Sequence, residues 1–244
     1  MRWLGALVLI AALTPAGGAR GREGLLLITA TAGYRHDSIP AAVAAVEQLA
    51  APLGLAVRRV DGPAPLATLD LAGVRLVVLA QSTGDFLAPA AREALQAFVE
   101  AGGGLVGIHA AADAHHAWAG WGRLLGTWFR SHPPGLQRTI VRFAPELPGL
   151  ASLGGGRSWE VTDEIYDFRD NPRGRVQVIA TVDESTYEGG RMGADHPIAW
   201  CFPLGAGRSW YTGLGHRAEL FAEPTFREHL RRGLAWAAGR GAHC

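Results

Sequence analysis

The sequence predicts an α/β protein with a doubly wound, mostly parallel sheet. Apolar runs without polar alternation recur in its first half, as expected for strands that are buried on both faces. Helical segments separate these runs, and a strand–helix–strand order produces parallel pairing. The length of 244 residues, of which 48% are hydrophobic and 18% charged, suits one globular domain with a sizeable core.

The first half of the chain supplies the parallel strands. The turn-like TAGYRHDS stands between the first strand and the first helix. The helix after the third strand begins at a proline, which fits a first helical turn, and ends at glycines 102–104. The elements expected here are strands at 24–31, 55–60, 74–80 and 105–109 and helices at 39–50 and 89–100.

The pattern changes after about residue 127. Shorter strands follow, with glycine and proline between them, and we expect an irregular β-rich extension over the ligand edge of the sheet. No internal repeat or low-complexity linker separates the halves, so residues 20–244 are interpreted as a single domain. The elements expected here are strands at 137–143, 158–166, 176–182, 197–202 and 207–215 and a closing amphipathic helix at 224–238.

The N-terminus has the pattern of a secretory signal peptide over residues 1–19. Arg2 precedes an apolar run, and small residues lead to Ala19, where we expect cleavage. The run is shorter than the roughly 20 residues that span a bilayer, so no stable membrane insertion is expected. The sequence therefore predicts a periplasmic or secreted protein.

The composition excludes several classes of function. The chain contains no lysine, which excludes Schiff-base chemistry, pyridoxal-phosphate attachment and a Walker-type phosphate loop. A net charge of +1 without a basic stripe argues against nucleic-acid binding. Two cysteines can pair in an oxidising compartment, but Cys201 lies in an apolar strand and Cys244 is the last residue, so the sequence does not favour the bridge.

Polar side chains collect where the parallel strands are expected to end. Ligands bind beyond the carboxyl ends of the strands in open parallel sheets, and four strands lead into polar or titratable residues there. His109 follows its strand directly, so a helix starting there would aim backbone N–H groups at a bound oxygen. The alternative is a histidine that only caps the helix. The candidates at this edge are His36, Asp37, Thr83, Asp85, His109, Asp113 and His216.

Loops of the second half add further candidates. The motifs FRSHP and GADHPIAWC place histidines before prolines, where the extended backbone aims the side chain, although such turns also occur without function. The segment VTDEIYDF alternates its carboxylates between two strand faces, which suits acid–base work or metal binding but equally a solvated face. Tryptophans near these loops suit sugar stacking or an ordinary core. The added candidates are His132, Asp163, Glu164, Tyr166, Asp195, His196 and Trp200.

Whether a metal is bound stays open at this point. No HxxxH or HxxE pair presents ligands locally, so a divalent ion such as zinc would need histidines from separate loops. The histidines considered as ligands are His109, His132, His196 and His216.

A series of motifs in this chain resembles the trehalose-utilisation (ThuA-like) family. The resemblance runs from about residue 25 to residue 239 and rests on YRHDSI, STGDF, GGGLVGIHAAAD, FRSHP, DEIYDF, ATVDESTY, GADHPIAWC, GRSWYTGLGH and HLRRGLAWAAG. Near residues 145–150 the family often has a further His-Pro, and this chain has APELPGL there, which weakens a ligand role for that loop.

The resemblance implies a flavodoxin-like fold within the class I glutamine amidotransferase-like superfamily. In that superfamily a turn between strand and helix, the elbow, carries a catalytic cysteine, and a histidine follows a late strand. Here His109 stands at the elbow and His216 at the late-strand position. Glutaminase activity is therefore not expected, because the thiolate nucleophile has been replaced.

The resemblance further implies carbohydrate metabolism with disaccharide or keto-sugar substrates. Proton abstraction, elimination, hydration or hydrolysis of such sugars needs a base and a group that polarises oxygen. We expect His109, His216 and Asp113 to be catalytic and the other candidates to bind sugar hydroxyls. The alternatives are a non-catalytic carbohydrate-binding domain that serves a partner sugar oxidoreductase and a glycosidase with two carboxylates. The oligomeric state, including a homo-oligomer, stays open.

Overall fold

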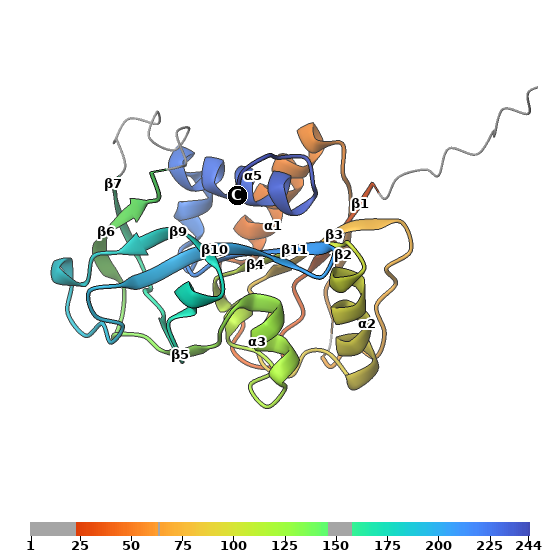
Figure 1. The fold of residues 1–244 in the computed structure, drawn as a ribbon, viewed down its shortest axis with the longest axis horizontal. Helices are drawn as coiled ribbons and strands as arrows, with labels where there is room; N and C mark the ends of the chain where they lie inside the picture. The colour runs from red at the N-terminus through yellow and green to blue at the C-terminus, as the bar shows by residue number, and fades with distance from the viewer. Residues whose placement is uncertain (1–22, 63, 146–157) are drawn as a thin grey trace, which may run out of the picture.

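The parallel half of the sheet forms as the sequence predicts. The computed structural model describes residues 23–62, 64–145 and 158–244, and its nine-stranded sheet is covered by helices on both faces (Figure 1). Adjacent strands of this half pair in parallel, in the order β2-β1-β3-β4-β11. These strands are β1 (Gly24–Ile28), β2 (Ala56–Val60), β3 (Val74–Ala80), β4 (Gly104–Ile108) and β11 (Gly207–Thr212).

The β-rich extension continues the same sheet. Four antiparallel strands follow β11 in the order β10-β9-β6-β7, and a separate two-stranded sheet pairs β5 with β8. The extension is therefore tied to the parallel half by main-chain hydrogen bonds through β10. These strands are β5 (Phe129–Ser131), β6 (Gln137–Phe143), β7 (Ser158–Asp163), β8 (Asp167–Phe168), β9 (Gln177–Val182) and β10 (His196–Leu204).

Within the described ranges, two helices cover each face of the parallel half. In Figure 1, α1 (Ile39–Ala50) and α5 (Pro224–Ala237) lie above the sheet, and α2 (Pro89–Glu100) and α3 (Ala119–Leu125) lie below it. The sequence analysis did not predict α3, whose AGWGRLL contains two glycines. Short 3-10 turns occupy Ala51–Leu53, His109–Ala112, Pro172–Gly174, Glu184–Thr186 and Ala218–Ala222.

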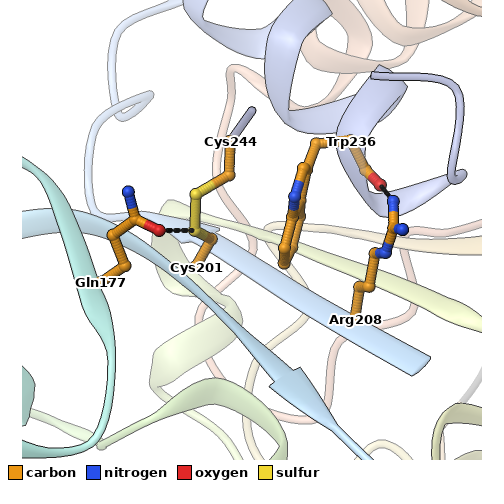
Figure 2. The surroundings of a disulfide bond; sticks show 5 residues. All are labelled: Gln177, Cys201, Arg208, Trp236 and Cys244. Atoms are coloured by element: carbon orange, nitrogen blue, oxygen red, sulfur yellow. Dashed lines mark hydrogen bonds between the residues drawn. A yellow bond between two sulfur atoms is a disulfide. The ribbon is translucent and has the colours of Figure 1, made fainter. Parts of the chain in front are cut away.

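A disulfide joins Cys201 in β10 to Cys244, which corrects the expectation that the bridge is disfavoured (Figure 2). Their Cα atoms are 6.3 Å apart. The tail after α5 returns to the sheet, and beside the disulfide Arg208 of β11 donates a hydrogen bond of 2.9 Å to the carbonyl oxygen of Trp236 in α5. Sequence spacing alone could not place the two cysteines together, because the return of the tail depends on how α5 packs.

Two expectations concern residues outside the described part of the chain. The signal peptide over 1–19 lies there, as does most of the segment at 145–150. Among the described residues, no helix is both long enough and apolar enough to cross a bilayer.

Candidate active site

His109 occupies a strained backbone position at the end of a central strand. It directly follows β4, and its φ of 47° lies in the left-handed region that favours glycine. Such strain at a strand end is typical of functional sites. The helix expected to start here is a single 3-10 turn, because the backbone leaves helical geometry at Asp113. A single helical turn therefore stands where a longer helix was expected, and the sharp elbow is present.

The ring of His109 is held in one tautomer. Its Nδ1 lies 2.7 Å from the carbonyl oxygen of Gly213, which can only accept, so Nδ1 carries a proton and donates it. The opposite nitrogen, Nε2, is buried and has no hydrogen-bond partner. A nitrogen presented in this way can act as a base or as a metal ligand.

Three other side chains converge on that nitrogen. Oε2 of Glu164 lies 3.3 Å from Nε2 of His109 and 3.2 Å from Nδ1 of His216. Nδ1 of His36 and Nδ1 of His216 are also buried without a hydrogen-bond partner. One ligand atom from each of the four residues lies within 4.8 Å of the others. We call His36, His109, Glu164 and His216 the histidine cluster. Imidazole lone pairs that face a carboxylate need a proton or a cation between them.

The local environment separates the pKa values within the histidine cluster. Burial, together with electrostatic repulsion from His109 and His216, lowers the pKa of His36 to about 3. Burial alone would raise the pKa of Glu164, but its contacts with His109 and His216 hold that pKa well below its usual range. Contact with Glu164 raises the pKa of His216. At neutral pH the cluster thus contains a neutral imidazole and an ionised carboxylate, the forms in which these groups bind metals.

The donor set of the histidine cluster fits a divalent ion. Zinc takes imidazole and carboxylate ligands, and bonds of roughly 2.0–2.1 Å in a tetrahedron place ligand atoms roughly 3.3 Å apart. The separations of Glu164 from His109 and His216, at 3.3 and 3.2 Å, match that value. The cluster could therefore hold a metal, with His36 and Glu164 in the places that the sequence analysis gave to His132 and His196.

A second group of potential ligands also makes hydrogen bonds within the protein. Asp167, Glu184 and His196 lie close together, but both carboxylates accept hydrogen bonds from backbone N–H groups of residues 191–193. His196 donates from Nε2 to the carbonyl oxygen of Tyr166 at 2.9 Å, and its Nδ1 lies 2.8 Å from Glu184. These hydrogen bonds stabilise a loop, and the group remains a second set of residues that could hold a metal, with His196 as the predicted ligand.

The histidine cluster opens into a pocket of about 420 Å³, within the range of small-molecule sites. Tyr166 packs on the His109 ring with centroids 4.2 Å apart, and Phe129 packs on Tyr166 at 4.3 Å. Nε2 of His132 lies 3.3 Å from Oε1 of Glu164. A larger hollow of about 640 Å³ over β6 and β9 has no histidine or carboxylate among its described lining residues. The smaller pocket is lined by Tyr34, His36, Asp113, Phe129, His132, Glu164, Tyr166 and His216.

Comparison with known proteins places this chain in a family. Residues 24–237 match the ThuA family, whose description is trehalose utilisation. The chain belongs to the ThuA family. Among curated proteins, none matches the chain.

Solved structures of ThuA-like proteins share the fold. One from Parabacteroides merdae is 22% identical with a TM-score of 0.68, over 91% of this chain and 92% of that one. Another, from Bacteroides uniformis, is 20% identical with a TM-score of 0.66, over 91% and 95%. A β-galactosidase from Bacillus circulans is 15% identical with a TM-score of 0.51, over 91% of this chain but 32% of that one. The predicted flavodoxin-like α/β fold is confirmed.

Buried polar residues hold the His216 turn of this ThuA-family chain from both sides. The carboxylate of Asp163 accepts hydrogen bonds from the backbone N–H groups of Gly215 at 2.7 Å and Arg217 at 3.1 Å. Gln81 donates to the carbonyl oxygen of Gly215 at 2.8 Å. Asp163 is fully buried, so its predicted contact with sugar hydroxyls is replaced by a role in positioning His216.

Other predicted sugar-binding residues lie outside the pocket lining. Thr83 is buried and donates to the carbonyl oxygen of Tyr34, while Asp85 faces His115 at 3.1 Å. Asp195 forms a surface ion pair with Arg173.

Trp200 is fully buried and donates to the carbonyl oxygen of Leu125, so the core interpretation of this tryptophan holds. Asp37 is exposed, and its charge acts on His216. His36, Asp113, His132, Glu164, Tyr166 and His216 line the pocket together.

Two aromatic residues of the pocket were not among the candidate site residues of the sequence analysis. Phe129 belongs to the short strand β5, and Tyr34 has 65% of its surface exposed at the pocket. A three-residue strand carries too little periodicity to be recognised. Tyr34 stands beside the predicted His36 in the motif YRHDSI, and this adjacency was the available signal.

Proposed function

We propose that this protein is an enzyme of carbohydrate metabolism that acts on a keto-sugar or a disaccharide. The observation that carries the proposal is the histidine cluster, with three buried imidazole nitrogens that lack hydrogen-bond partners beside an ionised carboxylate. Binding alone does not require such a concentration of titratable groups, whereas acid–base chemistry and metal chemistry do. The family description, trehalose utilisation, supports a sugar substrate.

The proposed cofactor is a divalent ion such as zinc in the histidine cluster. His36, His109 and His216 would supply nitrogen ligands and Glu164 an oxygen ligand. When bound, the ion supplies a Lewis acid for a carbonyl or hydroxyl oxygen. Asp113 and His132 remain at the pocket wall to accept or donate a proton, while Tyr166 and Phe129 offer aromatic faces to a sugar ring.

Without an ion, His109 and His216 take the roles of base and acid that the sequence predicts for them. His109 can exchange a proton only at Nε2, which faces Glu164, because Nδ1 is bound to Gly213, and contact with Glu164 raises the pKa of His216. Glutaminase activity is not expected in either case, because His109 stands at the elbow and both cysteines of the chain are paired.

Product analysis tests the enzyme proposal. The purified protein is incubated with disaccharides and with their 3-keto forms, with and without a chelator. We expect turnover of at least one sugar and its loss in a variant with His109→Ala and His216→Ala together. Unchanged turnover in this variant would contradict the proposal.

The second candidate is a non-catalytic carbohydrate-binding domain that serves a partner sugar oxidoreductase. It is favoured by the β-galactosidase comparison, in which this fold covers 32% of a larger enzyme. The same sugar panel separates the two candidates. A sugar that raises the melting temperature but is never converted would favour the binding domain.

We also propose that the protein is exported to an oxidising compartment. The signal-like N-terminus and the pairing of Cys201 with Cys244 support this location, because disulfides persist mainly outside reducing cytosol. Cell fractionation with an antibody tests it, and a protein found only in the cytosol would contradict it.

A further inference from the structure

A chain of hydrogen bonds leads from the pocket wall to the surface. His116 donates from Nε2 to Oδ1 of Asp113 at 2.7 Å, and Arg169 donates from Nη2 to Nδ1 of His116 at 2.6 Å. Asp113 and His116 follow β4, whereas Arg169 directly follows β8. The chain thus joins the parallel half of the protein to the β-rich extension beside the pocket.

The partners of His116 define its protonation state. A guanidinium group has only donors, so Nδ1 of His116 must accept and its proton must reside on Nε2. An imidazolium ring could not accept the bond from Arg169. His116 is therefore neutral, and it presents an N–H group to the carboxylate of Asp113.

Arg169 is itself held in place by three further contacts. Its guanidinium lies 5.0 Å over the Trp128 ring, its Nη1 donates to the carbonyl oxygen of His116 at 3.2 Å, and its backbone N–H donates to Trp128 at 2.9 Å. These groups are nevertheless open to solvent, with 37% of the His116 side chain and 34% of the Asp113 side chain exposed. Polar contacts this exposed add little to folding stability, as exposed ion pairs do, so stability alone does not account for this arrangement.

We propose that His116 and Arg169 are positioning residues that orient Asp113 as the proton acceptor of the pocket. This inference rests on the proposed function. In the step, a C–H bond of the substrate next to its carbonyl breaks, the proton goes to a carboxylate oxygen of Asp113, and the electron pair moves onto the carbonyl oxygen. His116 keeps its proton throughout and holds the carboxylate by its Nε2–H group.

The protonation state is tested on the full-length protein by ¹⁵N NMR of the histidine rings at neutral pH. We expect His116 to carry one proton, on Nε2, with a proton signal protected from exchange. Arg169→Met should abolish that protection, whereas the matched control Arg138→Met, in the exposed ion pair with Glu160, should leave it unchanged. A doubly protonated His116 ring, or equal spectra for the wild type and Arg169→Met, would overturn the proposal.

Kinetics with a 3-keto-disaccharide then test the effect on catalysis. His116→Ala should lower kcat about 10- to 100-fold with little change in KM, the cost of a misplaced catalytic group. His116→Gln should restore much of kcat, because a neutral amide can donate to Asp113 and accept from Arg169. Equal losses in both variants would overturn the positioning role. If the wild type converts no sugar, the proposed function fails, and the NMR result still decides the arrangement around His116.

Discussion

Opening the disulfide between Cys201 and Cys244 should destabilise the protein substantially. The bond closes a loop with a sequence separation of 43 residues. In the chain-entropy treatment, a loop of this length restricts the unfolded state by about 4 kcal/mol at 25 °C. For a protein of this size, 1 kcal/mol shifts the melting temperature by roughly 2–4 °C, so the expected loss is about 8–16 °C.

Thermal unfolding of the oxidised and reduced wild type measures this loss. Cys244→Ala is the matched variant, because it opens the loop and leaves Cys201 as a small buried thiol of apolar character. Its melting temperature should equal that of the reduced wild type and should not respond to reductant. Equal melting temperatures for oxidised and reduced wild type, with the thiols counted by mass spectrometry, would refute the reasoning.

Two further predictions concern buried ionisable groups. Asp163→Asn should lower the free energy of unfolding by about 2–3 kcal/mol and weaken zinc binding about 10- to 100-fold, because the amide cannot accept from both N–H groups of the His216 turn. Urea denaturation and zinc titration measure these two effects, and the surface variant Asp195→Asn is the control. An unchanged zinc affinity would contradict the positioning role of Asp163. Burial lowers the pKa of His229 from 6.5 to about 3. As the pH falls from 7 to 5, the unfolded chain therefore takes up a proton at this histidine while the folded protein does not, and the free energy of unfolding falls by about 2 kcal/mol. Urea denaturation at the two pH values should show that His229→Leu lacks this fall in the free energy of unfolding. An equal fall in the wild type and in His229→Leu would show that His229 is not its source.

The sequence could predict those parts of the fold and the site that depend on local pattern. The strands at 74–80 and 137–143 and the helix at 89–100 have the predicted bounds. The loop that carries His36 was singled out because it follows an apolar strand, and the segment that carries Glu164 because its carboxylates alternate along a predicted strand.

The features of the fold and the site that the sequence could not predict depend on long-range packing. The pairing of Cys201 with Cys244 depends on the path of the tail after α5. The separation of His196 from the histidine cluster depends on which carboxylates accept the N–H groups of a loop far along the chain. His116 gives no sequence signal, since its partner Arg169 lies on the other half of the protein.

The most direct test of the account is the metal content of the purified protein, measured together with turnover. Elemental analysis should find about one divalent ion per chain in the wild type and in Asp195→Asn, and much less in His109→Ala. Chelation should abolish sugar turnover, and zinc should restore it in the wild type but not in His109→Ala. A wild type that retains no ion, stays active in chelator and is unaffected by His109→Ala would contradict the assignment of the histidine cluster as the reaction centre.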